Sequence, residues 1–317
     1  MKMRKAAIRL GQLAVLFILV YYLVYKNLIL NWQTLSSQQW DFRWFPFTAS
    51  LLVMSLTFAA NSQVWRLVVY SLSGTSLRPY RAVYIWFVSN LGRYLPGKMW
   101  QIAGMAVLAR MDGVPAMEAA FSSVLGQVIC LLSGAALGLV FLPADLAGKY
   151  ASLLAWARLG LPVVLAFLYP PFLNRLLAWI SSLTGKPLAS RPLRLRDLLL
   201  FFTLNLVVWL VYGLCFHYFI LSVVPEAKLS LFDSIGIYAV GYIIGFLAVF
   251  APGGIGVREL LFTGLLSGSL GVMSATVVAL VSRIWLTLAE MVPLVIMLLI
   301  SGLPGKLSRS HPEGMDR

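Results

Sequence analysis

The sequence predicts an all-α fold, a polytopic bundle of transmembrane helices, and three observations support this prediction. The 317 residues are 60% hydrophobic and only 11% charged, whereas soluble proteins carry about 25% charged residues. Several apolar runs reach the roughly 20 residues needed to cross a hydrocarbon core about 30 Å thick. The polar stretches between them are too short for a separate soluble domain, so residues 1–317 are expected to form a single transmembrane domain.

Six apolar runs are predicted to cross the membrane completely. They are Ile8–Tyr25, Phe45–Val64, Met117–Leu142, Leu153–Tyr169, Leu198–Leu221 and Ser274–Ser301. The first run follows a short basic stretch, as in a secretory signal, but no small-residue cleavage site follows it, so we expect a retained span. Trp44 and Trp65 lie near the predicted ends of the second run, where interfacial aromatic residues are common.

Two further apolar segments are each interrupted by a proline–glycine break. Ala82–Leu108 is broken at Asn90–Lys98, and Ser234–Leu270 is broken at Phe250–Glu259. The first segment is too long for one straight helix and shorter than the roughly 45 residues of two spans and a turn. We therefore predict a re-entrant hairpin of two half-helices. The second segment is predicted to re-enter as well, although its first arm is long enough to span alone, and two crossings remain an alternative.

The distribution of Lys and Arg supports this layout. With a cytoplasmic N-terminus and two re-entrant segments, the outer loops hold only Lys26, Arg43, Lys149 and Lys228, while the cytoplasmic loops hold most other cations. The net charge of +14 is then explained by loops that face anionic lipid, and nucleic acid is not expected as a partner. Both termini are predicted to be cytoplasmic, in the cell's cytoplasmic membrane, with a disordered tail at 303–317.

The order of these elements predicts an inverted repeat. Residues 8–142 and 153–301 each contain two spans, a broken hairpin and a third span, but they start on opposite sides of the membrane. Pro96-Gly97 and Pro252-Gly253 occupy corresponding positions. Paired discontinuous segments in two such halves point to a transporter whose site lies between them. Chance agreement of two short glycine-rich stretches is the alternative.

The loop at 171–197 is predicted to lie at the cytoplasmic surface of the membrane. Pro171–Leu183 has the pattern of an amphipathic interfacial helix. Arg191–Arg196 follows and is basic enough to lie against anionic headgroups. A simple positive-inside loop is the plainer interpretation.

The two breaks are predicted to form a binding site. Unwound backbone within a membrane costs several kcal/mol for each N–H or C=O that protein, water or ligand does not satisfy. The residues expected to bind an anionic lipid headgroup are Arg93, Lys98, Arg258 and Arg283. Those expected to form the breaks and the cavity are Asn90, Pro96, Gly97, Gln101, Pro252, Gly253, Gly254, Gly256 and Glu259.

The chemistry expected at the second break is that of a helix start. A helix beginning after Gly256 aims free N–H groups at the break, which suits a phosphate with Arg258 beside it. Arg283 is expected either to contact the headgroup or to pair with Glu259 or Glu290. The alternative is structural, because glycines also allow tight helix crossing and cations also reach toward the membrane surface.

Catalytic, metal and cofactor sites are not expected. The two cysteines, Cys130 and Cys215, lie inside apolar runs, and the two histidines lie far apart in the sequence. No Ser-His-Asp spacing, His-Glu-x-x-His motif or Walker loop occurs. Only His217 and Glu259 are candidates for a headgroup-modifying enzyme, and His217 is better explained as a hydrogen-bonded packing residue.

The sequence at the two breaks resembles a known family. Asn90, Tyr94–Gln101, Pro252–Glu259 and Arg283 ahead of Met291–Pro293 are similar to the flippase-like family of the lysylphosphatidylglycerol synthase transmembrane region. The similarity extends over essentially the whole chain. It implies a carrier that moves an anionic lipid, either a phospholipid or a polyprenyl-phosphate-linked lipid, between leaflets. Its implied partners are membrane lipid and a glycosyltransferase or lipid-synthesis enzyme.

The chain departs from this family at three positions. Many relatives have a Glu where this chain has Gln101, and an acidic-basic pair where it has Gly126 and Gln127. These departures leave the headgroup open. The synthetase domain of some relatives has no counterpart here, so aminoacylation is not expected. Two other functions remain as alternatives: a non-transporting scaffold that presents lipid to a partner enzyme, and an enzyme that modifies lipid headgroups.

Overall fold

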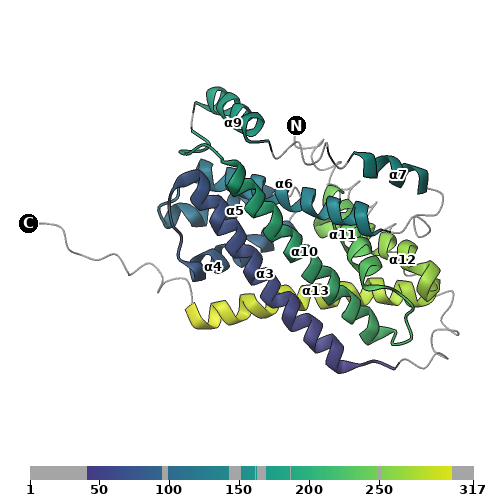
Figure 1. The fold of residues 1–317 in the computed structure, drawn as a ribbon. Helices are drawn as coiled ribbons and strands as arrows, with labels where there is room; N and C mark the ends of the chain where they lie inside the picture. The colour runs from purple at the N-terminus through teal and green to yellow at the C-terminus, as the bar shows by residue number, and fades with distance from the viewer. Residues whose placement is uncertain are drawn as a thin grey trace, which may run out of the picture.

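The computed structural model describes residues 41–94, 99–142, 151–160, 162, 169–185, 187–248 and 251–301, and within these ranges every regular element is a helix (Figure 1). In chain order they are α3 (Trp44–Ser73), α4 (Pro79–Asn90), η2 (Leu91–Tyr94), α5 (Met99–Met111), α6 (Ala116–Phe141), α7 (Ala151–Leu159), α9 (Pro170–Thr184), α10 (Leu195–Val223), α11 (Leu231–Leu247), η4 (Pro252–Gly254), α12 (Val257–Leu270) and α13 (Val272–Ser301).

Within the described part of the chain, four helices are long and apolar enough to cross a membrane: α3, α6, α10 and the Val272–Met297 part of α13. The prediction of an all-α transmembrane bundle is confirmed. The predicted span Ile8–Tyr25 and the tail at 303–317 lie outside the described residues. The predicted span Leu153–Tyr169 is described only in part, as α7 and the residues directly around it.

The predicted end of the second span at Val64 is wrong, because α3 continues to Ser73. Arg66, just beyond the predicted end, lies within this helix, and its guanidinium donates to the Leu77 carbonyl at 3.3 Å. Trp65 is consequently not an interfacial residue: its side chain is 2% exposed and its indole N–H donates to Ser123 Oγ at 3.2 Å. The helix ends at Gly74, which has a φ of +73°.

The first broken segment is a re-entrant hairpin. Its arms α4 and α5 have 12 and 13 residues, which at 1.5 Å per residue gives about 20 Å each, too short to cross the membrane. The arms run antiparallel, because Gly104 lies against Ser89 and Gly92 lies against the start of α5. Arg81, at the start of α4, forms a bidentate ion pair with Asp112, just after α5, at 2.7–3.0 Å. The segment therefore begins and ends at the same end of the bundle.

The second broken segment is also a hairpin of two antiparallel helices. Gly245 lies against Arg258 and Gly241 lies against Phe262, so α11 and α12 run antiparallel. Its open end lies beside the C-terminus of α6, where Phe232 stacks on Phe141 with 5.0 Å between ring centroids. The open end of the first hairpin lies beside the N-terminus of α6. The two hairpins thus enter from opposite ends of the bundle, and their tips η2 and η4 are in contact.

The spanning helices frame these hairpins. Antiparallel α3 and α10 pack along their lengths, and the backbone N–H of Arg43 bonds to the Ser222 carbonyl at one end. Exchanging α3 with α10, α4 with α11, α5 with α12 and α6 with α13 leaves the set of contacting pairs among these helices unchanged.

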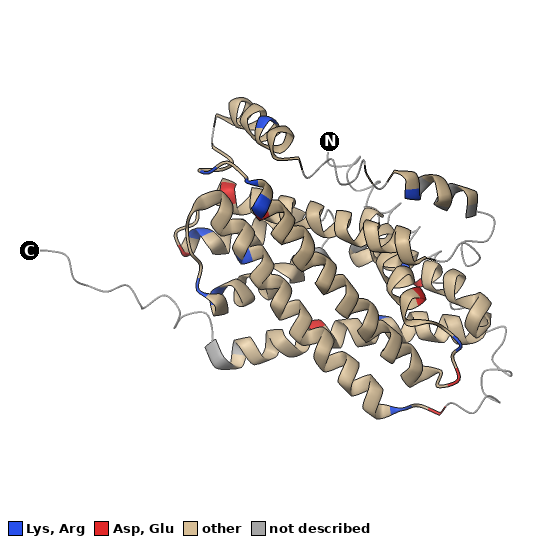
Figure 2. Ribbon diagram, viewed as in Figure 1, with Lys and Arg blue, Asp and Glu red and all other residues tan. Residues whose placement is uncertain are grey.

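Basic residues gather at one end of the bundle (Figure 2). We call the end where α3 finishes and α6 and α10 begin the basic end. Its described cations are Arg66, Arg78, Arg81, Arg110, Arg175, Arg191, Arg194 and Arg196, whereas the described cations of the opposite end are Arg43, Arg158 and Lys228. The loop helix α9 lies beside the basic end, as predicted for 171–197, and Asn174 fixes it by hydrogen bonds to both the N–H and the C=O of Leu193 at 2.9 Å.

The ion pair between Arg81 and Asp112 is expected to stabilise the first hairpin. The two side chains are 11% and 23% exposed, so removing either one leaves its partner partly buried and unpaired. We expect Arg81→Ala and Asp112→Ala each to lower the free energy of unfolding by about 2–4 kcal/mol, and the double variant to cost little more than either single one. The free energy is measured by unfolding in mixed micelles.

The matched control is the exposed pair Arg43–Asp41 at the opposite end, with side chains 53% and 76% exposed and 3.5 Å between nearest atoms. Arg43→Ala is expected to change stability by less than about 0.5 kcal/mol. If the stability losses of the Arg81 and Asp112 single variants add up in the double variant, the stabilising role of this ion pair is contradicted.

Candidate functional site

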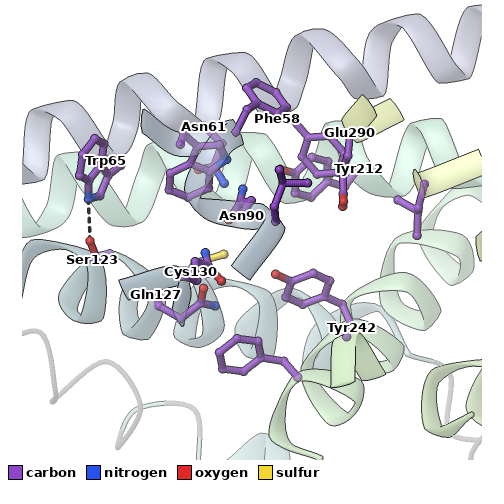
Figure 3. A pocket seen from close by; sticks show the side chains of 18 of the residues that line it. Phe58, Asn61, Trp65, Asn90, Ser123, Gln127, Cys130, Tyr212, Tyr242 and Glu290 are labelled. Atoms are coloured by element: carbon purple, nitrogen blue, oxygen red, sulfur yellow. Dashed lines mark hydrogen bonds between the residues drawn. The ribbon is translucent and has the colours of Figure 1, made fainter. Parts of the chain in front are cut away.

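A cavity of about 150 Å³ lies where the two hairpin tips meet. We call it the central cavity. Its walls come from both hairpins and from α3, α6, α10 and α13 (Figure 3). In Figure 3 Trp65 and Ser123 stand at one side of the cavity and Tyr242 and Glu290 at the other, with Asn90 between them.

Most of the described residues that were predicted from the sequence to form the site do line this cavity. Asn90 and Gln101 reach it from the first break, and Gly253, Gly254, Arg258 and Arg283 reach it from the second break and α13. Gly256 and Glu259 are buried beside these residues but do not line the cavity. The side chains of Arg93, Lys98, Pro96 and Pro252, and the whole of Gly97, lie outside the described part of the chain.

Glu259 holds the two arginines of the cavity in place. Its Oε1 lies 3.4 Å from Arg258 Nη2 and 3.9 Å from Arg283 Nη1. Arg283 Nη1 also donates to the Gly253 carbonyl at 2.8 Å. Because Glu259 is buried behind the guanidinium groups that line the cavity, it offsets their charge in a low-dielectric region. Arg283 thus both pairs with Glu259, as one of the predicted alternatives had it, and lines the cavity.

The N-terminus of α12 already has a hydrogen-bond acceptor from its own helix. Glu259 Oε2 accepts a hydrogen bond of 2.7 Å from the Gly256 N–H, so a carboxylate lies at the start of the helix where the sequence suggested a phosphate. The reason is local: Glu259 is the third residue of the helix, from which a glutamate reaches back to the residue before the helix. An anion in the cavity therefore meets the guanidinium groups rather than the helix end.

Arg258 occupies an unfavourable position for a cation. It lies in the first turn of α12, where the helix dipole disfavours positive charge. Its side chain is buried, and its Nε has no hydrogen-bond partner among the described residues. A buried guanidinium N–H without an acceptor costs about 1–3 kcal/mol or more, so an acceptor that reached this atom would stabilise the arrangement.

The second break depends on glycine. Gly254 has a φ of +70°, and a Cβ at this position would lie 2.9 Å from the Gly245 carbonyl oxygen. An L-residue is disfavoured both by the backbone conformation and by this contact. Gly254 therefore lets η4 fold directly against the backbone of α11.

Uncharged polar and aromatic side chains make up much of the remaining wall. Asn61, Gln127 and Asn205 line the cavity from α3, α6 and α10, together with Tyr212 and Tyr242. Gln127 Nε2 is buried without a partner among the described residues. The three departures from the family pattern, Gln101, Gly126 and Gln127, all face this same cavity.

The sequence did not indicate the aromatic members of the site. Tyr212, Tyr242 and Trp86 line the cavity, yet each lies in an apolar run in which a large aromatic residue normally signals packing. The two tyrosines could have been recognised from the sequence, because a tyrosine in the middle of a helical span has a buried phenol that needs a hydrogen-bond partner.

His217 has a structural role, as expected. Its Nδ1 lies 2.9 Å from Ser234 Oγ, and it does not line the central cavity. Across the described ranges, no group of three or more His, Cys, Asp or Glu is arranged to hold a metal ion.

Comparison with known proteins gives one result. The family described as the lysylphosphatidylglycerol synthase TM region matches residues 9–305, nearly the whole chain. A search of curated proteins finds no match.

Replacing Gly254 is expected to disrupt the second break. Gly254→Ala should lower the free energy of unfolding by about 1–3 kcal/mol, because the residue must hold a positive φ against the Gly245 carbonyl. Gly264 of the same hairpin is the matched control, since a Cβ there meets no atom within 4 Å. Gly264→Ala is expected to be neutral or stabilising by up to about 1 kcal/mol. Equal losses for both variants would contradict the role of Gly254.

Proposed function

This chain belongs to the family of the lysylphosphatidylglycerol synthase TM region, and we propose that it is a flippase-like carrier that moves an anionic lipid between the leaflets of the cytoplasmic membrane. The substrate is a phospholipid or a polyprenyl-phosphate-linked lipid. The carrier acts without enzymatic chemistry: the cavity binds the headgroup and the acyl chains stay in the surrounding lipid.

The observation that carries this proposal is the central cavity at the meeting point of two re-entrant tips. A polar, arginine-lined cavity at that depth is costly in a membrane, since a charge near the bilayer centre costs about 2.5–3.5 kcal/mol on insertion scales. Here Arg258 and Arg283 line it while Glu259 supports them from behind. Such a cavity offers a phosphate a polar binding site between the two leaflets.

We also propose that the two halves form the inverted repeat predicted from the sequence. The contact pattern among α3–α6 and α10–α13 is preserved when the halves are exchanged, and the hairpins enter from opposite ends. Two such halves allow alternating access, in which the cavity opens first toward one leaflet and then toward the other.

Lipid scrambling in liposomes tests the function. The purified protein should equilibrate a fluorescent anionic phospholipid between leaflets, measured by dithionite quenching. Arg258→Met together with Arg283→Met should reduce the rate at least tenfold, because the headgroup loses both cations that line the described cavity. Methionine keeps much of the side-chain volume, and monodisperse elution in detergent checks the fold.

Arg196→Met is the matched control, because Arg196 is exposed at the basic end and away from the cavity. It should scramble lipid at the wild-type rate. An Arg258/Arg283 variant that folds and scrambles normally would refute the assigned role of both arginines.

The orientation is the second part of the proposal: the basic end faces the cytoplasm, as the positive-inside rule favours. Ser76 lies exposed at this end, and Glu226 lies exposed at the opposite end. The native cysteines are buried, so an introduced cysteine dominates labelling. In intact cells a membrane-impermeant maleimide should label Glu226→Cys directly, and Ser76→Cys only after permeabilisation. The reverse pattern would overturn this orientation.

A scaffold that presents lipid to a glycosyltransferase or lipid-synthesis enzyme is the second candidate, and α9 favours it. Leu173, Leu177 and Ile180 pack on the bundle, while Trp179 and Leu183 on the other side of the helix are 61% and 66% exposed. This apolar face suits either the membrane interface or a partner protein. A wild-type protein that binds lipid but does not scramble it would favour the scaffold.

A further inference from the structure

Two residues in the wall of the central cavity have a buried side-chain polar atom without a partner in the described ranges: Arg258, at Nε, and Gln127, in its amide group. They come from α12 and α6, two different elements. An ammonium group has three donors and no acceptor. It therefore cannot accept a hydrogen bond from Arg258 Nε.

The charged residues and the side-chain amides of the described wall come from different elements. Arg258, Arg283 and Glu290 are its charged residues, and they belong to α12 and α13. The helices α3, α4, α5, α6 and α10 contribute amides and hydroxyls to the described wall, namely Asn61, Asn90, Gln101, Ser123, Gln127, Asn205 and Tyr212.

A carboxylate for a cationic headgroup is not available on the amide side. Glu290 is the one carboxylate in the described wall; it lies on the same helix as Arg283 and already interacts within the protein. Residues 93–98 contain no acidic residue. An ammonium at the amide side would be desolvated without a counter-charge, which is strongly unfavourable.

Hydroxyl groups fit this surface. A hydroxyl has one donor and two acceptor positions, and a side-chain amide presents both a carbonyl oxygen and an NH₂ group. We propose that the central cavity binds a phosphodiester headgroup whose terminal part is uncharged and hydroxyl-rich, as in glycerol or a sugar. The phosphate lies against Arg258 and Arg283, and the hydroxyls lie against Asn61 and Gln127. This inference specifies the substrate class of the proposed carrier and rests on that function for its biological role.

Binding of matched lipids to the purified protein tests this inference separately from transport. Phosphatidylglycerol, phosphatidylethanol and phosphatidylethanolamine share a phosphodiester and differ in carrying hydroxyls, a plain ethyl group or an ammonium. We expect phosphatidylglycerol to bind about tenfold tighter than either of the others, as two additional hydrogen bonds allow. A glycosyl phosphoprenol in the same assay distinguishes a sugar from glycerol as the source of the hydroxyls.

Asn61→Leu with Gln127→Leu should remove this preference by weakening phosphatidylglycerol binding about tenfold while leaving phosphatidylethanol binding unchanged. Thr57→Val is the matched control, because Thr57 is buried in the same helix as Asn61 but does not line the cavity. If the double variant does not fold, Gln127→Glu provides the second test: the new carboxylate should shift the preference toward phosphatidylethanolamine.

The outcomes separate the two proposals. A wild-type protein that binds all three lipids equally, or prefers phosphatidylethanolamine, overturns the hydroxyl-rich headgroup even if it scrambles lipid. A protein that prefers hydroxylated lipids but scrambles none supports the headgroup class and refutes the carrier.

Discussion

The hydrogen bonding of backbone at the second hairpin tip is the constraint on which the structure depends. Unwound backbone at that depth must be satisfied within the protein. The Gly253 carbonyl accepts from Arg283, the Gly254 N–H bonds to the Ala251 carbonyl, and the Gly256 N–H bonds to Glu259. Charged side chains therefore stabilise the break. Since each charge is itself costly in a membrane, the break and its Glu259-centred cluster are stable only together.

The same arginines face the cavity, so fold and ligand binding are coupled through them. A ligand oxygen that approaches Arg283 competes with the Gly253 carbonyl and with Glu259 for its N–H groups. Any rearrangement of Arg283 is then transmitted to the backbone of η4, which contacts η2 of the other hairpin. In the proposed carrier, headgroup binding and movement of the two tips would share one set of hydrogen bonds, which is the coupling that alternating access requires.

The sequence predicted the features that depend on length and composition. Arm lengths and proline–glycine breaks predicted both hairpins, and Gly254 and Arg258 of the second break line the cavity together with Arg283 of the last predicted span. Features that depend on helix rotation and helix ends escaped prediction. Trp65 was assigned to the interface because it lay near the predicted end of the second span, but Arg66 bonds to Leu77 and α3 continues to Ser73. Glu259 was placed in the cavity, but its reach to Gly256 holds it behind the arginines.

The division of the cavity wall distinguishes the two halves that we propose as an inverted repeat. Exchanging the helices of the two halves preserves the contacting pairs among them, yet the described charges lie on α12 and α13, while their counterparts α5 and α6 contribute Gln101 and Gln127. Two chemically identical halves would bind a phosphate equally well at either side. With guanidinium groups on one side and amides on the other, the phosphate and the terminal part of the proposed headgroup would have distinct places, and the proposed carrier would hold its lipid in one orientation relative to the two hairpins.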